Sequence, residues 1–401
     1  MRKQYKYSIV VELMANIVAE YVWIDGEGNL RSKARTINIA AHALWRELSG
    51  VRDFSSYEQS TKRGEDLLST LPDWNYDGSS TKQAEGKFSE IIIKPRFCVR
   101  CPFRRWNQPE GYLHAILVMC DTYKPDGEPA LNNNRKWANE IFNKNLEAEP
   151  WYGLEQEFFL MSSSTSNEPF GYSGDIAHKG QGQFYCSVGS QNAFGRKVVD
   201  DMYEHCLYAG LNISGVNAEV AVGQWEYQIG PSKGINAGDE LYLSRYIIQR
   251  IAEKYNIRVD FEPKPVAGDW NGSGCHTNYS TKAMREGTVE KSDYSSAEAR
   301  DSTGAEKTGL EYIHEAIDKL SLKHAEHMEM YGTGNELRMT GEHETSSYDT
   351  FTYGCGNRGA SVRIPTQTEK DKKGYFEDRR PSSNMDPYLV TGIIFRTTVV
   401  E

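Results

Sequence analysis

Hydrophobic and polar residues alternate along several short stretches in the first third of the chain. Residues 19–37 hold two such stretches around a turn at Gly26–Asn29, which predicts a β-hairpin. Apolar runs at Ser89–Ile93 and Leu113–Cys120 predict buried strands. Asp73–Thr81 is dense in turn-forming residues and predicts a loop. This part of the chain is therefore expected to consist of strands and loops.

Farther along the chain, the spacing of the apolar residues changes to that of helices. Trp151–Met161 still predicts a strand, because it is rich in aromatic and apolar residues. Residues 196–209, 239–255 and 306–330 place apolar side chains at helical spacing, and Arg135–Asn145 predicts a shorter helix. We expect these apolar stripes to form the core.

Pro, Gly and Asn gather between Pro125 and Asn134, which predicts a domain boundary there. A chain of 401 residues is long enough for one large or two medium domains. Residues 38–70 are mixed and polar, as in an insertion at the surface, and Lys291–Lys307 is a second polar loop candidate. No internal repeat is visible.

Composition narrows the class of protein. Hydrophobic residues make up 38% and charged residues 25% of the chain, as in soluble globular proteins. We find no run of about 18 apolar residues that could span a bilayer and no signal peptide. We therefore expect a cytoplasmic protein without a membrane partner. The net charge of −10 argues against a nucleic-acid partner, which requires a basic surface.

Seven cysteines, an odd number, do not form a disulfide framework. Cys98 and Cys101 form a single Cys-x-x-Cys pair, with no second pair at the spacing of a zinc ribbon. A structural role is favoured over a metal or redox role, and both remain open.

Paired carboxylates give the first indication of chemistry. Glu155 and Glu157 lie in an apolar strand, whose period of two directs both side chains to one face. Leu154, Gln156 and Phe158 then point to the other face. Two buried carboxylates on one face are costly unless a cation neutralises them.

Glu219 and Glu226 form a second pair within a predicted strand–turn–strand segment, in which Trp225–Ile229 alternates. Carboxylate ligands of this kind suit Mg²⁺ or Mn²⁺. Either pair alone could equally belong to a solvated face or to an ion-paired rim. Their recurrence on separate apolar strands favours a cation site.

A glycine-rich segment, Gly268–Thr281, contains His276. Its glycines allow the backbone to approach a ligand closely, so His276 is a candidate metal ligand. The alternative is a histidine satisfied within a loop. No Gly-x-x-x-x-Gly-Lys-Ser/Thr motif occurs, which argues against a P-loop enzyme.

Arginines recur through glycine-containing segments near the C-terminus, at Arg338, Arg358, Arg363, Arg379 and Arg380. Arginines spaced in this way can clamp phosphate or carboxylate groups, or they can form a surface charge lattice. His343-Glu344 resembles half of a zinc-protease motif, but Ser347 stands where the second histidine would be. His324 and His327, three residues apart on a predicted helix, are a weaker metal candidate.

Seven segments occur in the order seen in glutamine synthetases, and they resemble the shorter, eukaryote-like class II form. The resemblance extends from about Glu20 to the end of the chain. The segments are Asp73–Thr81, Gly153–Phe158, Asn217–Pro231, Phe261–Thr281, Arg338–Thr345, Asn357–Pro365 and Gly374–Pro387.

The resemblance implies an α+β fold in two domains. Residues 1–128 would form a small β-grasp-like domain, and residues 129–401 a catalytic domain with a curved antiparallel β-sheet backed by helices. It also implies a homo-oligomer, a decamer of two pentameric rings, with each active site shared between neighbouring subunits.

The implied ligands of at least two divalent cations per site are Glu155, His276 and Glu377 for one ion and Glu157, Glu219 and Glu226 for the other. The residues matching the glutamate-binding set are Asn271, Gly272, Arg338 and Arg379. Those matching nucleotide contacts are Asn278, Ser280 and Arg363.

Arg358 matches the arginine that neutralises the transferred phosphoryl group. Asp77, from the adjacent subunit, matches the group that takes a proton from ammonium, and Ser80 and Tyr185 would line that site. Glu344 matches the carboxylate of a flap that covers the intermediate.

The implied reaction joins ammonium to L-glutamate with ATP as co-substrate. Oxide is too poor a leaving group for direct amidation, so ATP first converts the γ-carboxylate to γ-glutamyl phosphate. Divalent cations and an arginine would stabilise the anionic oxygens gathered in that step. Ammonia then displaces phosphate and yields L-glutamine, with ADP and phosphate as the other products.

The departures from the family pattern are local. Asp269 stands where asparagine is common, and residues 38–70 and 286–309 are expanded. Two alternatives remain, a γ-glutamyl ligase that uses a larger amine and an inactive scaffold. The full match at Asp77, Ser80 and Tyr185 favours ammonium, and the complete ligand set disfavours a scaffold.

Overall fold

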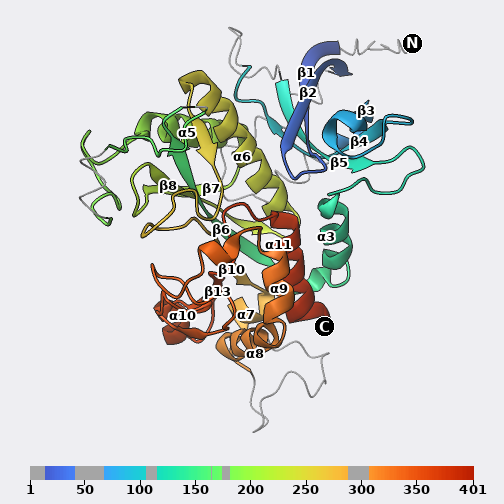
Figure 1. Cartoon of the computed structure of the whole chain (residues 1–401). Coiled ribbons are helices and arrows are strands. Elements are labelled where there is room, and N and C mark those ends of the chain that lie inside the picture. Colours follow the sequence, from blue (N-terminus) through green and yellow to red (C-terminus); the bar gives the residue numbers. More distant parts are fainter. Residues whose placement is uncertain (1–13, 41–66, 105–114, 164, 174–180, 288–306) are drawn as a thin grey trace, which may run out of the picture. The chain divides into compact units, whose positions relative to one another are not determined.

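The computed structural model describes residues 14–40, 67–104, 115–163, 165–173, 181–287 and 307–401 (Figure 1). The chain divides into two compact units. The first consists of Met1–Asn132 with Tyr208–Gly210, and the second of Asn133–Leu207 with Leu211–Glu401. Residues 291–306 of the predicted loop Lys291–Lys307 and most of residues 38–70 lie outside the described residues. The β-grasp-like type assigned to the first unit stays a prediction.

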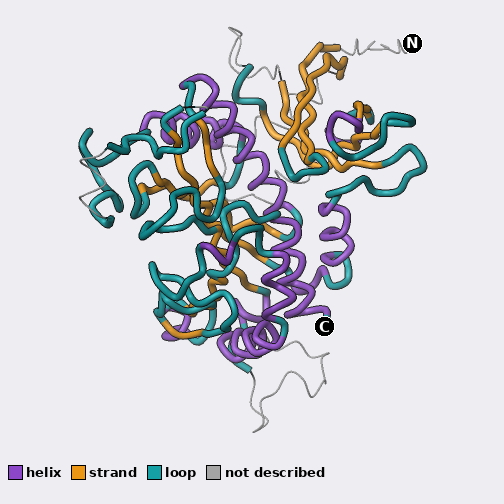
Figure 2. Tube along the Cα trace, in the orientation of Figure 1, coloured by secondary structure: helices purple, strands orange, loops and turns teal. Residues whose placement is uncertain are grey.

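The first unit contains a five-stranded sheet with the strand order β2-β1-β5-β4-β3 (Figure 2). Strand β1 pairs antiparallel with β2 and parallel with β5. The elements are β1 (Met14–Ile24), β2 (Leu30–Ala40), β3 (Trp74–Asp77), the 3-10 helix η1 (Gly78–Thr81), β4 (Glu90–Arg100) and β5 (Ala115–Tyr123). The predicted hairpin and both predicted strands are confirmed, although β4 continues through Pro95 with an irregular register before Phe97.

The hairpin turn is built around Asp25, which is fully buried. Its Oδ1 accepts hydrogen bonds from the backbone N–H groups of Glu27 and Asn29 at 2.8 and 2.9 Å. Its Oδ2 accepts a hydrogen bond from Nε of Arg31 at 2.8 Å. One short side chain thereby accepts hydrogen bonds from the backbone of the turn that the sequence pattern predicted.

The prediction of a loop at Asp73–Thr81 is wrong. Trp74–Asp77 form strand β3 against β4, and the turn formers that follow make the helix η1. Trp74 packs edge-on to Tyr21 at 5.7 Å between ring centroids, and Tyr76 stacks on Trp23 at 4.4 Å. Aromatic packing of this kind, about 0.5–1.5 kcal/mol per pair, outweighs the turn propensity of the neighbouring residues.

The second unit contains an eight-stranded curved sheet with the order β11-β12-β13-β10-β6-β8-β7, in which β9 also pairs with β6. All pairs are antiparallel except β11 with β12. The strands are β6 (Trp151–Met161), β7 (Ile213–Ala218), β8 (Gln224–Lys233), β9 (Arg258–Asp260), β10 (Cys275–Ser280), β11 (Tyr353–Cys355), β12 (Val362–Ile364) and β13 (Phe376–Asp378). The predicted α+β fold with a curved antiparallel sheet is confirmed.

Helices accompany this sheet. They are α3 (Asn134–Phe142), α5 (Arg196–Ala209), α6 (Asn236–Tyr255), α7 (Lys282–Glu286), α8 (Gly309–Leu322), α9 (His324–Met330), α10 (Thr366–Asp371) and α11 (Pro387–Phe395), with short turns η2 (Leu146–Ala148), η4 (Asn335–Leu337) and the π-helical η5 (Arg396–Val400). Helix α6 packs on β6, β8 and β9, and α11 packs on α3 and α6. The predicted helix at residues 306–330 is two helices that meet at Lys323.

Strand β6 follows the predicted period of two. Leu154, Gln156 and Phe158 are fully buried on the face toward the helices, whereas Glu155 and Glu157 are only partly buried on the other face. None of the helices in the described part of the chain is long and apolar enough to cross a membrane. All seven cysteines are described, and none forms a disulfide.

Candidate active site

A pocket of about 570 Å³ lies in the second unit, on the face of the sheet that carries Glu155 and Glu157. Carboxylates and arginines both line it. Its walls include Glu155, Glu157, Tyr185, Asn217, Glu219, Glu226, Gln228, Asn271, Gly272, His276, Arg338, His343, Glu344, Arg358, Arg363, Glu377 and Arg379. The structure thus brings together side chains from residues 155 to 379.

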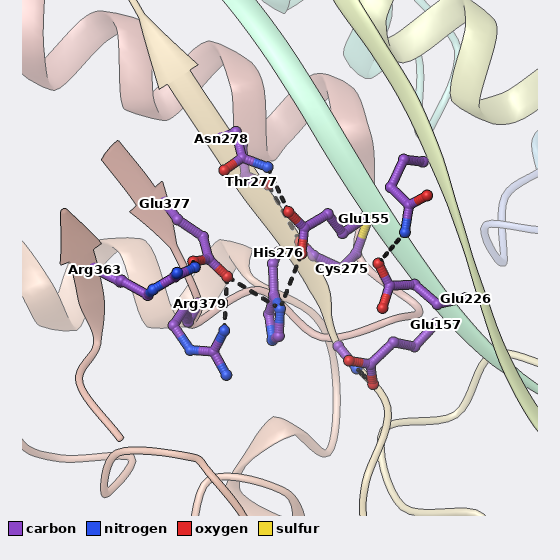
Figure 3. A network of polar contacts seen from close by, with 12 residues as sticks. Glu155, Glu157, Glu226, Cys275, His276, Thr277, Asn278, Arg363, Glu377 and Arg379 are labelled. Carbon is purple, nitrogen blue, oxygen red and sulfur yellow. Dashed lines mark hydrogen bonds and ion pairs between the residues drawn. The ribbon is translucent and has the colours of Figure 1, made fainter. Parts of the chain in front are cut away.

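Sheet register assembles the first cluster of candidate ligands. Glu155 on β6 lies directly opposite His276 on β10, and Glu377 on β13 lies opposite the next residue but one, Asn278. Nδ1 of His276 is 3.6 Å from Oε2 of Glu155 and 3.4 Å from Oε1 of Glu377 (Figure 3). One donor atom from each of the three residues lies within 4.8 Å of the others, which is close enough for all to bind one ion.

His276 does not lie in a glycine-rich turn, as the sequence suggested. The glycine-rich segment ends at Gly274, and Cys275 begins strand β10. Burial lowers the pKa of His276 well below its usual value, so the imidazole is neutral and keeps a lone pair for a metal. The fixed register of β10 on β6 places Nδ1 of this imidazole beside both carboxylates.

Glu377 is almost completely buried and already has cationic partners. Nη1 of Arg363 donates to its Oε2 at 2.8 Å, and Nη1 of Arg379 donates to its Oε1 at 2.7 Å. On the opposite side of the cluster, Nδ2 of Asn278 donates to Oε1 of Glu155 at 2.7 Å. These hydrogen bonds orient both carboxylates toward His276.

Glu157, Glu219 and Glu226 form a second cluster with a different balance of charge. Glu157 and Glu226 are register partners on β6 and β8, and Glu219 lies just after β7. Their hydrogen-bond donors are neutral groups: Gly274 N–H to Glu157 at 2.9 Å, the amide of Asn217 to Glu219 at 2.9 Å, and the amide of Gln228 to Glu226. Within the described ranges, these carboxylates form no salt bridge to a lysine or arginine.

Burial and mutual repulsion change the protonation of this cluster. Burial, together with the charge of Glu226, raises the pKa of Glu157 to about 8. Burial and the charge of Glu157 raise the pKa of Glu219 to about 10, and burial also raises that of Glu226. Hard oxygen ligands of this kind suit a divalent cation, although among the described residues only Glu155, His276 and Glu377 bring three donor atoms within 4.8 Å of one another.

Arg338 forms the base of the arginine-lined wall. It is buried, and its Nη2 donates to the backbone carbonyls of Arg379, Arg380 and Pro381 at 2.9 to 3.1 Å. Burial lowers its pKa to about 10, so it remains charged at neutral pH. Gly272 packs directly on it, because a Cβ there would lie 2.5 Å from Cγ of Arg338.

The segment bearing Glu344 lines the pocket and contacts two of its arginines. Nη2 of Arg379 donates to the backbone carbonyl of Glu344 at 3.1 Å, and Nη1 of Arg358 lies 3.7 Å from Oε2 of Glu344. His343 and Glu344 both adopt the left-handed conformation, with φ of 52° and 59°. Nε2 of His343 lies 2.8 Å from Oδ1 of Asp269, the residue at which the sequence departs from the family pattern.

Four predicted site residues do not line this pocket. Asn278 and Ser280 lie on β10, where the hydroxyl of Ser280 accepts a hydrogen bond from Nη1 of Arg285 at 2.9 Å. Asp77 and Ser80 belong to the first unit. Hydrogen bonds from Ser79 and Ser80 hold the pKa of the exposed Asp77 well below its usual value.

Three amides that contact the carboxylates were not predicted. Asn217 and Gln228 are described above, and Nε2 of Gln224 lies 3.4 Å from Oε2 of Glu157. The period of two along β8 places Gln224, Glu226 and Gln228 on one face, so the pattern that identified Glu226 also contained this signal.

His324 and His327 do not form a metal site. The ring nitrogens of His324 are hydrogen-bonded with the Tyr348 carbonyl and with Arg380, at 2.9 and 3.0 Å. Those of His327 are hydrogen-bonded with the hydroxyls of Tyr331 and Thr397, at 2.7 and 2.9 Å. Each imidazole is therefore already satisfied within the protein.

Carboxylates that repel one another across a pocket from arginines are typical of enzymes that bind anionic substrates together with divalent cations. The fold and the pocket define the chain as a candidate for that class of enzyme.

Comparison with known proteins identifies the family. The family described as glutamine synthetase, catalytic domain, matches residues 133–398. A nodule isozyme of glutamine synthetase from Medicago sativa is 48% identical over 392 residues, which cover 97% of this chain and 96% of the relative. Cytosolic isozymes from Oryza sativa and Vitis vinifera are also 48% identical, over 96% and 97% of this chain and 94% and 96% of their own lengths.

The chain belongs to the glutamine synthetase family. The resemblance to the eukaryote-like form is therefore confirmed, and so is the predicted activity. The protein is a carbon–nitrogen ligase that amidates L-glutamate with ammonium, using ATP and passing through γ-glutamyl phosphate. The family uses ATP and a divalent metal.

Proposed function

We propose that glutamate amidation takes place in the carboxylate- and arginine-lined pocket of the second unit. Glu155, His276 and Glu377 would hold one divalent cation, and Glu157, Glu219 and Glu226 a second, with Mg²⁺ or Mn²⁺ as the metal. The observation that carries this proposal is the presence of both clusters in one pocket: donor atoms of Glu155, His276 and Glu377 lie within 4.8 Å of one another, and the hydrogen-bond donors of the second cluster in the described residues are neutral. Bound cations would supply neutralising charge for the phosphate oxygens of ATP.

The arginines would bind and orient the anionic substrates. Arg338 and Arg379, with Asn271 and Gly272, would hold L-glutamate so that its γ-carboxylate faces the transferred phosphoryl group. Arg358 would neutralise that group, since its half-exposed guanidinium faces the pocket. Asn278, Ser280 and Arg363 would contact the nucleotide, with Arg363 at the pocket wall and the first two farther along strand β10.

Asp77, supplied by a neighbouring subunit, would bind ammonium and take its proton, with Ser80 and Tyr185 beside it. Its low pKa keeps the carboxylate ionised, which suits the binding of a cation. Ammonia, once deprotonated, would attack the acyl phosphate. Glu344 would close over the intermediate and keep water away from it, consistent with the position of its segment at the pocket.

Sites shared between subunits require an oligomer, and we propose the decamer of two pentameric rings. We also propose a cytoplasmic location. The names of the rice and grape relatives, which are cytosolic isozymes, support this location.

Phosphate release with ATP, Mg²⁺ and L-glutamate, measured with and without ammonium, tests the proposed site. We expect ammonium-dependent release and glutamine formation, both lost in Arg358→Ala. Turnover with hydroxylamine or a polyamine but not with ammonium would contradict the proposal. Asp77→Ala should impair amide formation far more than ATP binding, and an equal loss of both would count against its role as proton acceptor.

A further inference from the structure

Arg245 lies in the middle of helix α6, behind the strand that carries Glu155 and Glu157, and is 6% exposed. Its Nε donates to Oε1 of Gln156 at 2.8 Å. Nη1 and Nη2 donate to the backbone carbonyls of Met385 and Ser383, both at 2.9 Å. All three acceptors are neutral.

Two buried arginines form no salt bridge within the described segments, Arg338 at the pocket and Arg245 behind the sheet. The buried Arg135 and Arg380 form ion pairs with Asp239 and Asp378, at 2.7 Å in both cases. Arg245, in contrast, forms no salt bridge with any acid in the described segments. The rings of Tyr242 and Phe261, at 5.6 and 5.4 Å, add weak cation–π attraction. Burying a guanidinium without a counter-charge is costly, so its retention calls for a role.

Gln156 connects Arg245 to the carboxylates on the opposite face of β6. While its Oε1 accepts from Arg245, its Nε2 donates to the backbone carbonyl of Glu157 at 2.8 Å. The same Nε2 donates to Ser383 O at 3.0 Å, and this carbonyl also accepts from Arg245. The guanidinium therefore fixes the peptide that carries Glu157.

The segment on the other side of Glu157 is tied to the same network. The backbone N–H of Ser383 donates to Ser273 O at 3.1 Å. One residue on, Gly274 exchanges two hydrogen bonds with Glu157: its N–H donates to Oε2 at 2.9 Å, and its carbonyl accepts from Glu157 N–H at 3.0 Å. Arg245 thus joins strand β6, residues 383–385 and residues 273–274 around one carboxylate.

We propose that Arg245 is a positioning residue for the second cation site. Its planar fork fixes the backbone on both sides of Glu157, and through it the position of that carboxylate opposite Glu226. The inference rests on the proposed function, because it takes Glu157 as a metal ligand. A guanidinium presents N–H donors from three nitrogens in fixed directions, and a lysine ammonium cannot satisfy the same three acceptors with the same geometry.

The test is the affinity for Mn²⁺, measured by electron paramagnetic resonance on the purified full-length protein without substrates. Arg245→Lys keeps the charge and removes the fork, and Arg245→Met removes both. Arg250→Lys, on the same helix with a side chain 30% exposed, is the matched control. We expect about tenfold weaker binding in Arg245→Lys, a larger loss in Arg245→Met and wild-type binding in Arg250→Lys, since outer partners of metal ligands are worth about 10- to 100-fold in affinity.

The circular dichroism spectrum of each variant checks that it is folded, and Arg245→Lys decides the question if Arg245→Met does not fold. Wild-type affinity in folded Arg245→Lys would overturn the positioning role and leave Arg245 as a packing residue only. A wild-type protein that binds no Mn²⁺ would instead refute the proposed cation site. The two failures are therefore distinguishable.

Discussion

The two faces of the catalytic sheet treat buried charge in opposite ways. Glu377 and Asp378 are consecutive on strand β13 and point to opposite faces. On the helix side, Asp378 pairs with Arg380 at 2.7 Å, and both side chains are completely buried. On the pocket side, Glu377 pairs with Arg363 and Arg379 and lies beside Glu155 and His276 (Figure 3). Glu157, Glu219 and Glu226 line the same pocket and form no salt bridge to a lysine or arginine in the described residues.

The helix side of the sheet stabilises the fold, whereas the pocket side leaves its carboxylates available for ligands. The helix side is saturated: Asp378 also accepts from Tyr331, whose hydroxyl is hydrogen-bonded with His327. The pocket side keeps like charges together, as the raised pKa values of Glu157 and Glu219 record. Groups on the helix side should therefore govern stability, and groups on the pocket side should govern binding and activity.

Breaking the buried pair on the helix side should have the largest effect. Arg380→Met leaves Asp378 buried without its partner, so we expect the free energy of unfolding to fall by about 3–5 kcal/mol. Urea unfolding measures this loss. Arg358→Met, at the half-exposed pocket-side arginine, is the control and should leave stability nearly unchanged while lowering activity. Equal losses of stability in both variants would remove the distinction between the faces.

Glu219→Gln tests the pocket side, where activity should fall and the stability of the metal-free protein should rise. We expect the turnover rate to fall by about 100-fold, because a ligand of the cation site is lost. The metal-free protein should become more stable at pH 8, by up to about 5 kcal/mol. A variant that is both less active and less stable would contradict this account.

The sign of the Glu219 effect follows from its raised pKa. The folded state holds a proton on Glu219 up to a pKa of about 10, whereas an unfolded glutamate loses it near its ordinary value of 4.5. Folding then requires proton uptake between these values, so wild-type stability falls as pH rises through that window. Glutamine takes up no proton on folding, so the variant does not lose stability in this way. The gain should therefore be absent near pH 4 and grow toward pH 8.

On the helix side, the buried His327 should make the stability of the protein sensitive to acid. Burial, followed by the charge of Arg380, lowers its pKa to about 3. The folded state therefore resists a proton that the unfolded state accepts, and stability present above pH 6.5 is lost as pH falls toward 3. At pH 5 the loss is about 2 kcal/mol. Urea unfolding at pH 7 and pH 5 should show a smaller loss in His327→Gln, and an unchanged loss would contradict this assignment.

Asp269→Asn should have the smallest effect. The ion pair between Asp269 and His343 is largely exposed, with 90% of the aspartate side chain accessible. Exposed pairs contribute little, so we expect kcat/KM to change by about fivefold at most. The same steady-state assay measures it. A change as large as that in Glu219→Gln would mean that this contact controls the segment bearing Glu344.

The pattern of apolar and polar residues predicted the elements whose conformation depends only on residues close by in the sequence. The period of two in Trp151–Met161 correctly separated Glu155 and Glu157 from Leu154, Gln156 and Phe158, because strand geometry alone fixes alternate faces. The hairpin at Asp25 was equally readable. Strand β3 was not, because the packing of Trp74 and Tyr76 on residues more than 50 positions away decides its conformation.

The hydrogen bonds of Arg245 behind the sheet could not be predicted from the sequence either, because its partners are distant along the chain. Arg245 finds its acceptors at Gln156, Ser383 and Met385, up to 140 positions away. His327 has the spacing of a metal ligand relative to His324, and only the fold reveals that hydroxyls occupy its ring nitrogens. Glu377 entered the candidate site through family resemblance, since no spacing linked it to Glu155.

The most direct test of the central claim is the stabilisation of the chain by Mn²⁺ at pH 8. Thermal unfolding of wild type and Glu157→Gln would be compared with and without the ion. A cation held by the uncompensated carboxylates binds the folded state alone, so the wild-type midpoint should rise with Mn²⁺ concentration. In Glu157→Gln the metal-free midpoint should be higher and the rise much smaller. An equal rise in both proteins would show that the cation binds elsewhere and contradict the account.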